Sequence, residues 1–225
     1  VKDGIYDRGS KKNNVVEAKK VADLVFEHFR KYPNRSLGVV TFSEAQQNAI
    51  DARNCNLLVS AAALEEKIIT TDEEIFDTGK YTYFKDYQPA CWIYNQSGGG
   101  THGYVNVSEA IRDSCNIFFF DTGRRLTIEK INSYAEKFGF GQNSGIELAA
   151  EERTGVVASP ENRKKSGGIW YPGDVCQTAI GQSDNLFTPM QLASFFSTVV
   201  NGGTRYETHL LKSVNDFKTG KRLLE

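Results

Sequence analysis

The sequence lacks long apolar runs. No stretch approaches the roughly 18 consecutive apolar residues of a membrane-spanning helix, so no such helix is expected. Residues 1–10 are polar and charged, which does not fit the basic and then apolar pattern of a secretory signal peptide. Taken by itself, the chain is expected to be soluble and to carry neither a signal nor a membrane anchor.

The short patterns that mark metal and nucleotide sites are also lacking. No two of the four cysteines have C-x-x-C spacing, and the three histidines do not complete a zinc pattern. No Gly-x-x-x-x-Gly-Lys-Ser/Thr loop is present, so ATP hydrolysis is not indicated. No cofactor is expected, and the cysteines are interpreted as free, partly buried thiols, with a disulfide left open. These cysteines are Cys55, Cys91, Cys115 and Cys176.

Strong charge of either sign is absent. The formal net charge is -1, whereas nucleic-acid-binding proteins are usually clearly basic, so nucleic acid is not an expected partner. Ten Lys and Arg stand against seven Asp and Glu in residues 1–53, and seventeen against twenty-one in residues 54–225. With 225 residues and 40% hydrophobic content, the chain can form one good core, or one domain plus a fragment.

Residues 1–53 have a strand–helix–strand–helix pattern. Residues 4–7 and 37–42 have strand character, and the segment between them has the periodicity of an amphipathic helix. A second helix is expected from Glu44 to about Arg53. Such a β-α-β-α unit is a piece of a parallel sheet, and two strands and two helices alone are a fragment that needs neighbours.

The rest of the chain predicts helices separated by turns and short strands. A capping box at Thr188-Pro189-Met190-Gln191 marks one helix start, and Gly139 is suited to the left-handed end of another. The expected elements are a helix over 57–66, turns and short strands over 67–106, a helix–turn–helix element over 107–121, helices over 127–138 and 188–200, and strands over 208–215 and 221–224.

Several short stretches then occur in a particular order. They are Leu64-Glu65-Glu66, Cys91-Trp92, His102-Gly103, Val107-Ser108-Glu109-Ala110-Ile111, Ser114-Cys115-Asn116, Phe138-Gly139-Phe140-Gly141, Gly145-Ile146-Glu147-Leu148, Ala179-Ile180-Gly181-Gln182-Ser183, Thr188-Pro189-Met190-Gln191-Leu192-Ala193 and Asn201-Gly202-Gly203. In this order they resemble the class B penicillin-binding proteins, above all the elongation- and sporulation-type transpeptidases, over about residues 57–225. A single stretch would be weak evidence, but the ordered set is specific.

The resemblance implies an α+β fold, namely a penicillin-binding transpeptidase (serine β-lactamase-like) domain, here incomplete. It also implies peptidoglycan D,D-transpeptidase chemistry, in which a serine attacks a peptide carbonyl and forms an acyl-enzyme. A lysine three residues later lies on the same helix face and can take the proton of the serine. The implied ligands are stem peptides ending in D-Ala-D-Ala, and β-lactams that mimic them. The implied partners are other cell-wall synthesis proteins, at the extracytoplasmic face of a bacterial membrane.

Ser114 and Asn116 match the family's Ser-x-Asn motif. The resemblance implies that Ser114 relays a proton towards the leaving amine and that the Asn116 amide holds the substrate backbone. By themselves, a Ser and an Asn in a helix–helix turn more often cap the neighbouring helices. The ordered matches around them favour the catalytic interpretation.

The nucleophile of the family is missing. It should lie just before Leu57, where this chain has Arg53-Asn54-Cys55-Asn56, and no serine in the chain is followed by lysine at the third position. Cys55 lies near the expected place, but neither lysine nor histidine stands at helical spacing from it, and a linker thiol is the plainer interpretation. The chain is therefore predicted to be inactive.

Lys218-Thr219-Gly220 spells the family's third motif in the wrong context. An active-site strand needs small or apolar neighbours against which a substrate can lie, but Asp216-Phe217 precedes this tripeptide and Lys221-Arg222 follows it. The tripeptide is interpreted as a hairpin turn, and the functional Lys-Thr-Gly strand is expected beyond Glu225.

The chain is thus expected to divide into two segments. Residues 54–225 form the partial transpeptidase domain, and residues 1–53 resemble a fragment of a superfamily-one helicase motor domain. Three alternatives to an active enzyme stay open: a catalytically dead module that binds peptidoglycan or a protein, a nucleic-acid-binding fragment, and a chimeric or misassembled chain joined near residues 51–56. His102 is interpreted as a loop residue rather than a base, and an incomplete domain is expected to be poorly soluble or to oligomerise.

Overall fold

The computed structural model describes residues 23, 24, 27, 31, 44–147, 150–209, 211 and 213–224, with no side-chain description for 44–54 and 224. The strands expected over 4–7 and 37–42 lie outside the described residues. Residues 23, 24, 27 and 31 are helical, as the amphipathic pattern predicts. Among the described residues, no helix combines the length and the apolar character that crossing a bilayer requires.

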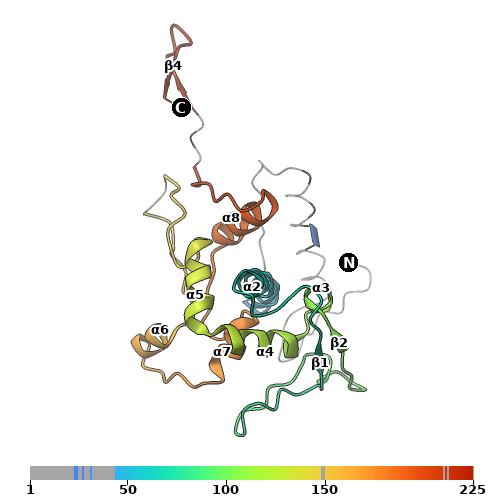
Figure 1. Cartoon of the computed structure of the whole chain (residues 1–225). Helices are drawn as coiled ribbons and strands as arrows, with labels where there is room; N and C mark the ends of the chain where they lie inside the picture. The colour runs from blue at the N-terminus through green and yellow to red at the C-terminus, as the bar shows by residue number, and fades with distance from the viewer. Residues whose placement is uncertain are drawn as a thin grey trace.

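Helix α2 (Glu44–Glu65) lies at the centre of the molecule (Figure 1). Two helices were expected here, over 44–53 and 57–66, but the structure has one. No proline or glycine interrupts residues 44–65, so nothing in the sequence breaks the hydrogen-bond ladder. The C-terminal half of α2 is almost entirely buried, including Leu58, Val59, Ala62 and Ala63.

The helix–turn–helix prediction is confirmed by α3 (Val107–Asp113) and α4 (Asn116–Leu126). Helix α4 packs against both α2 and α7 (Asp174–Ala179), and it contributes three phenylalanines in a row, Phe118 to Phe120, to the core. Three consecutive buried side chains point over roughly 200° of a helix circumference, so α4 must be covered on more than one side. It is the second central element of the fold.

The other helices surround this centre. Helix α5 (Ile128–Lys137) packs against α2. Gly139, which follows it, has a φ of 88°, in agreement with the left-handed helix end predicted from this glycine. Helix α8 (Pro189–Val200) has the expected capping box, in which Thr188 accepts from the Gln191 backbone and the Gln191 side chain accepts from the Thr188 N–H. The short helices α6 (Pro160–Lys165) and α7 have no counterpart in the sequence expectations.

Strands are few among the described residues. β1 (Ile75–Asp77) pairs antiparallel with β2 (Gly103–Val105), within the segment for which short strands were expected. β3 (Val214–Asn215) pairs antiparallel with β4 (Arg222–Leu224) around the turn that contains Lys218, Thr219 and Gly220. The hairpin interpretation of this tripeptide is confirmed, although β3 is shorter than the strand expected over 208–215.

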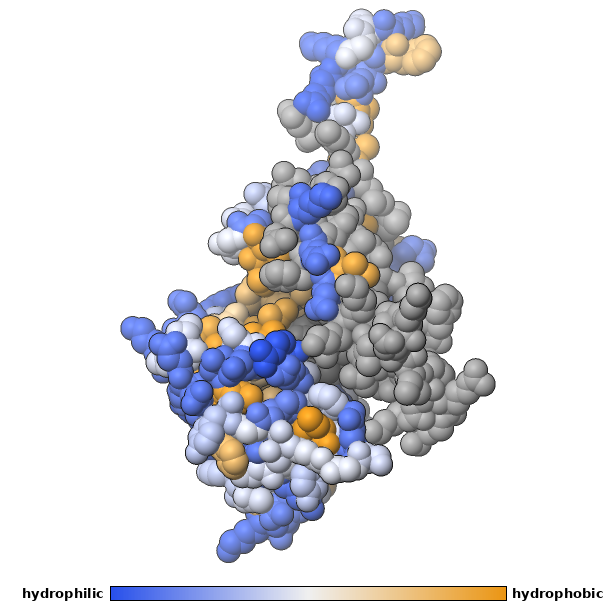
Figure 2. Space-filling view, turned by 90° about the vertical axis from the view of Figure 1, so that its right-hand side faces the viewer, coloured by the Kyte–Doolittle hydropathy of each residue, from blue (hydrophilic) through white to orange (hydrophobic). Residues whose placement is uncertain are grey.

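The β3–β4 hairpin stands away from the helical body (Figures 1 and 2). Its described residues are almost all exposed, and Phe217 is 100% exposed. The body is thus a mixed α+β unit with one contiguous core, and the hairpin contributes little to that core.

Candidate functional site

Ser114 and Asn116 lie at the turn between α3 and α4. Ser114 ends α3 in the left-handed region, with a φ of 53°, and Asn116 is the first residue of α4. Both side chains are half-buried, whereas Cys115 between them is fully buried. The two candidate residues are therefore held in one tight turn anchored by the intervening thiol, with their side chains partly open to solvent.

Asn56 is the side chain of α2 that reaches this turn. Its amide nitrogen donates a hydrogen bond to the Ser114 hydroxyl at 3.2 Å, across 58 positions of sequence. Asn56 is 2% exposed, and its side-chain oxygen is buried without a hydrogen-bond partner among the described residues. A buried polar group with an unmade hydrogen bond costs free energy, so this amide is an unusual choice for a core position.

Arg53 lies on the same helix as Asn56. Arg53 precedes Asn56 by three residues on α2, the spacing at which serine and lysine share one helix face in the family pattern. An arginine stays protonated and an amide does not accept protons at neutral pH, so these two residue types supply neither a nucleophile nor a base. Cys55 is buried and 3% exposed, which agrees with a structural thiol.

A second constellation, which the sequence did not reveal, lies directly beside the turn. Asp77, Cys91, His102 and Cys115 bring one ligand atom each into a group whose members all lie within 4.8 Å of one another. Asp77, Cys91 and Cys115 are fully buried, and the His102 side chain is 7% exposed. We call these four residues the Asp-Cys-His-Cys cluster.

Four separate segments contribute to the cluster. Asp77 ends β1, His102 immediately precedes β2, and the antiparallel pairing of the two strands brings them together. Cys91 follows the bridge between Lys80 and Ala90, with its backbone N–H bonded to the Gly79 carbonyl at 2.8 Å. Cys115 is the N-cap residue that immediately precedes α4. No local spacing links these residues, which is why a search for sequence patterns missed them.

The distances between the ligand atoms approach the edges of a tetrahedron. His102 Nδ1 lies 3.5 Å from the Cys91 sulfur and 2.7 Å from Asp77 Oδ2, and the Cys115 sulfur lies 3.6 Å from Asp77 Oδ2. Ligand atoms at the usual metal–ligand distances of tetrahedral zinc stand roughly 3.3–3.7 Å apart. Two of the three distances already fit this range, and the third needs an expansion of roughly half an ångström.

Electrostatics within the cluster favour negative charge on one thiol and on the carboxylate. The hydrogen bond from the Cys115 thiol, with help from the Asn116 backbone N–H, lowers the pKa of Cys91 to about 7 although burial opposes it. The same Cys91–Cys115 hydrogen bond, together with burial, raises the pKa of Cys115. Burial raises the pKa of Asp77, but the backbone N–H groups of His102 and Gly79 outweigh it, so that pKa is lowered.

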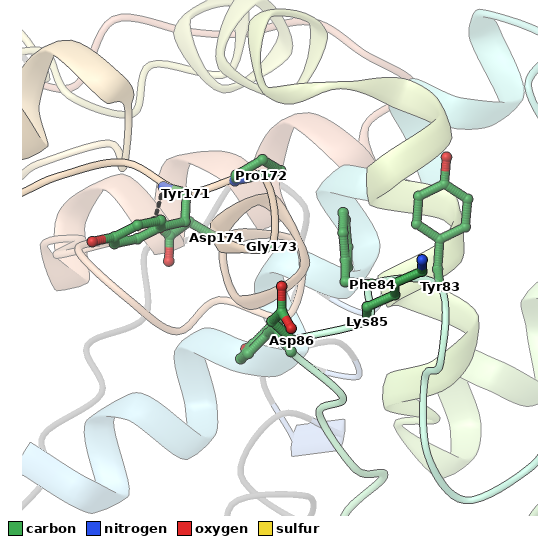
Figure 3. A pocket seen from close by; sticks show the side chains of 9 residues that line it. Tyr83, Phe84, Lys85, Asp86, Tyr171, Pro172, Gly173 and Asp174 are labelled. Carbon is green, nitrogen blue, oxygen red and sulfur yellow. Dashed lines mark hydrogen bonds between the residues drawn. The ribbon is translucent and has the colours of Figure 1, made fainter.

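A separate cavity of about 630 Å³ lies between two loops, residues 83–87 and 171–174 (Figure 3). Its wall is largely aromatic and includes Tyr83, over which the Arg124 guanidinium stacks at 4.0 Å. Arg124 is near the C-terminal end of α4, whereas Ser114 precedes its N-terminal end, so roughly 15 Å of helix separates the two places. The cavity is not part of the Ser114–Asn116 site.

The family of the chain follows from comparison with known proteins. The model of the penicillin-binding protein transpeptidase domain matches residues 57–224, about three-quarters of the chain. The chain therefore belongs to the penicillin-binding protein transpeptidase family, and the α+β fold expected from the resemblance is confirmed.

Two groups of curated relatives stand out. The chain is 28% identical over 174 residues to the peptidoglycan D,D-transpeptidase MrdA of Haemophilus influenzae, covering 77% of this chain and 26% of that protein. It is 30% identical over 162 residues to MrdA of Escherichia coli, covering 69% of this chain and 24% of that protein. It is 34% identical over 165 residues to stage V sporulation protein D of Bacillus subtilis, covering 73% of this chain and 23% of that protein. The chain thus spans about a quarter of the length of these relatives.

Solved structures of penicillin-binding proteins share the fold of this chain. Penicillin-binding protein 2 of Pseudomonas aeruginosa superimposes with a TM-score of 0.66 at 27% identity, covering 77% of this chain and 38% of that one. Penicillin-binding protein 2 of Helicobacter pylori, in its complex with MreC, gives a TM-score of 0.61 at 27% identity, covering 70% of this chain and 28% of that chain. The family match begins at residue 57, so the helicase resemblance of residues 1–53 stays a prediction.

Proposed function

We propose that residues 54–225 carry the central part of a peptidoglycan D,D-transpeptidase domain that does not form an acyl-enzyme as it stands. The observation that carries this proposal is the contact between Asn56 and Ser114. Ser114 and Asn116 supply the Ser-x-Asn side of the proposed site, whereas Asn56 on the facing helix offers an amide where proton transfer would require a base. Catalysis by Ser114 and Asn116 in a complete domain is part of the same proposal.

The proposed ligands are stem peptides ending in D-Ala-D-Ala, and β-lactams as their mimics. The proposed location is the extracytoplasmic face of a bacterial membrane, where cross-linking of peptidoglycan takes place. The complex of the Helicobacter pylori relative with MreC supports a cell-wall synthesis protein as the partner class.

The test of the missing acylation is an intact-mass spectrum of the purified chain after incubation with excess benzylpenicillin. No mass gain is expected, because the described side chain of α2 that contacts Ser114 is the Asn56 amide, which is not a nucleophile. A stoichiometric gain of one penicilloyl group would contradict the proposal. The modified residue would then be mapped, with Cys55 and Ser60 first, because both lie on α2 close to Asn56.

A binding module without catalysis is the second function that the Ser114–Asn116 turn supports, because both side chains remain partly open to solvent. We expect weak binding of a D-Ala-D-Ala peptide, detectable by NMR at millimolar concentration, and loss of that binding in Ser114→Ala and Asn116→Ala. Ser108→Ala, at an exposed position of α3, is the matched control. Absence of any shift at millimolar peptide would eliminate this function.

We also propose that the Asp-Cys-His-Cys cluster binds one divalent metal ion, with zinc the best match. One carboxylate, one imidazole and two thiolates are ligands that zinc accepts, and the four atoms already converge within 4.8 Å in the core. Bound there, the ion would tie the β1–β2 hairpin to the start of α4. Its role is structural, because all four protein positions are filled and none is left for water or substrate.

The metal proposal is tested by elemental analysis of the chain after loading with zinc chloride and removal of excess. One zinc per chain is expected, with a higher melting temperature because a ligand that binds only the folded state stabilises it. Cys115→Ser and His102→Ala should each abolish stoichiometric binding, whereas Cys176→Ser should not, because Cys176 faces the Phe120 carbonyl instead. Zinc retention unchanged in Cys115→Ser and His102→Ala would overturn the site.

A join of two unrelated segments near residues 51–56 is proposed for the N-terminal side of the chain. The start of the family match at residue 57 supports it. Sequencing independent source DNA across codons 45–65 tests whether the join is natural, since a misassembled junction would not recur. Salt-sensitive binding of single-stranded DNA would support the helicase-like interpretation of residues 1–53.

A further inference from the structure

The Asp-Cys-His-Cys cluster contains two thiols, and they are neighbours. The sulfur atoms of Cys91 and Cys115 lie within 4.8 Å of each other. Both residues are 0% exposed and both are free. The other two thiols, Cys55 and Cys176, belong to the core but not to this cluster.

We propose that Cys91 and Cys115 are a redox modification site. In the metal-free chain, a low-molecular-weight disulfide oxidises the pair to an intramolecular disulfide bond, and a metal ion bound in the cluster prevents this. The protective half of the inference rests on the proposed metal site. The disulfide half rests only on the position of the two sulfurs.

The chemistry balances with one oxidant. One cysteine thiolate attacks a sulfur of the small disulfide, forming a mixed disulfide and releasing one thiolate. The second cysteine thiolate then attacks the protein sulfur of the mixed disulfide, forming the Cys91–Cys115 bond and releasing the second thiolate. Two electrons pass from the cysteines to the small disulfide, and the two protons leave with the released thiols. Metal-bound thiolates are unavailable for the first attack.

The local structure allows the two sulfurs to close to bonding distance. A disulfide requires the sulfurs to approach to about 2.05 Å, with their Cβ atoms about 3.8 Å apart. Cys115 is fixed at the start of α4, but Cys91 opens the irregular segment of turns over 92–99. The movement can therefore come from the Cys91 side, without disturbing α4.

The modification would reach the candidate catalytic turn. Cys115 separates Ser114 from Asn116 in the turn between α3 and α4. Trp92, the neighbour of Cys91, donates its indole N–H to the Asp113 carbonyl at 3.1 Å. A covalent bond at Cys115 thus constrains the residue between the two proposed catalytic side chains. Disulfides persist outside the cytoplasm, which is the proposed location of the domain.

The test uses the full chain in two forms, one stripped with a chelator and one loaded with zinc chloride. Both are incubated with oxidised glutathione, alkylated under denaturing conditions and measured by intact mass. The metal-free form is expected to lose two of its four alkylatable thiols, and the zinc form none. Trypsin cleaves after Lys85, Arg112 and Arg124, so the bond should link peptides 86–112 and 113–124 in a non-reducing digest.

Variants and outcomes separate the two halves of the proposal. Cys55→Ser and Cys176→Ser should still form the linked peptides, whereas Cys91→Ser and Cys115→Ser should not. Four thiols retained by the metal-free form, or a bond to Cys55 or Cys176, would overturn the modification site even if zinc binds. Equal oxidation of both forms, with no zinc retained by elemental analysis, would overturn the metal site and leave the disulfide site standing.

Discussion

Asn56 is a buried amide with one hydrogen bond made and one unmade. Its nitrogen donates to Ser114, and its oxygen has no partner among the described residues. Asn56→Ala is expected to destabilise the fold by about 1 kcal/mol, because it removes one hydrogen bond but also one buried unsatisfied oxygen. Urea unfolding measures the change. Ser60→Ala is the matched control on the same face of α2, because the Ser60 hydroxyl bonds only the Asn56 carbonyl of its own helix.

A loss in Asn56→Ala that is no larger than the loss in Ser60→Ala would mean that the contact with Ser114 contributes nothing. A loss of several kcal/mol would mean instead that Asn56 holds the α3–α4 turn in place.

Glu66 shows how a single carboxylate can make stability depend on pH. The hydrogen bonds from Lys130, at 2.5 Å, and from Tyr134, at 3.0 Å, lower the pKa of Glu66, although burial slightly opposes this. A carboxyl with a lowered folded pKa stabilises the fold above its unfolded pKa of about 4.3, and this contribution is lost as pH falls through the folded pKa. The free energy of unfolding of Glu66→Gln should therefore fall less steeply than that of the parent chain as the pH drops below about 5.

Chemical unfolding at several pH values between neutral and acid measures this slope. Glu65→Gln, at the exposed neighbouring position, should keep the slope of the parent chain. Identical slopes in all three proteins would show that the ion pair with Lys130 is fully screened by solvent.

The proposed catalytic residues could be singled out from the sequence, whereas the Asp-Cys-His-Cys cluster could not. Ser114 and Asn116 stand in a contiguous motif, so one short window of sequence was enough to single them out. The cluster draws its ligands from the end of β1, from the residues just before β2 and α4, and from the segment before Trp92, and only the fold brings them together. His102 looked like a loop residue because its partner, Asp77, is 25 positions away.

At the scale of elements, α4 and α7 approach each other closely at Gly123. A β-carbon added at Gly123 would lie 2.4 Å from the Ala179 β-carbon, well inside van der Waals contact. Gly123→Ala should therefore destabilise the fold by about 1–3 kcal/mol, although alanine is the better helix former. Thermal unfolding measures the loss.

The compensating variant makes this prediction specific. Gly123→Ala combined with Ala179→Gly restores the space between the helices, and it should recover most of the loss despite a second glycine substitution. Equal destabilisation of the single and double variants would show that the contact between α4 and α7 is not the cause.

Elements with strong local signals were predicted and those without them were not. The capping box of α8 and the glycine after α5 fix helix ends through hydrogen bonds and φ values that the sequence encodes locally. Helices α6 and α7 are six residues each, too short for a periodic apolar pattern to emerge. The continuous α2 differs from the two predicted helices because a boundary between two segments was expected near residue 54, and no proline or glycine there interrupts the helix.

At the scale of the whole molecule, the β3–β4 hairpin is nearly independent of the helical body. Its described residues pair with each other and are almost all exposed. Deleting residues 213–225 should leave the melting temperature unchanged within about 2 °C, because little apolar surface of the body is uncovered. Differential scanning calorimetry measures it, and a drop of many degrees would show that the hairpin packs on the body.

The same truncation addresses self-association. Two short strands and an exposed Phe217 offer unpaired backbone groups and apolar surface to another copy. If the hairpin mediates the expected oligomerisation, light scattering should show that the truncated chain is monomeric at concentrations where the full chain is not. Equal masses would assign oligomerisation to another surface.

The uninterrupted helix α2 has a consequence for the relation between its two ends. Residues 44–53 and 57–65 share one helix axis. The number of residues between them therefore fixes how far one segment is rotated about that axis relative to the other. One inserted residue would rotate the N-terminal end by about 100° and move it by about 1.5 Å, whereas an insertion of four residues would nearly restore the phase. If the join near residues 51–56 arose by recombination, only some lengths of the joined segment would have kept the present angular relation between residues 44–50 and Asn56 around the helix axis.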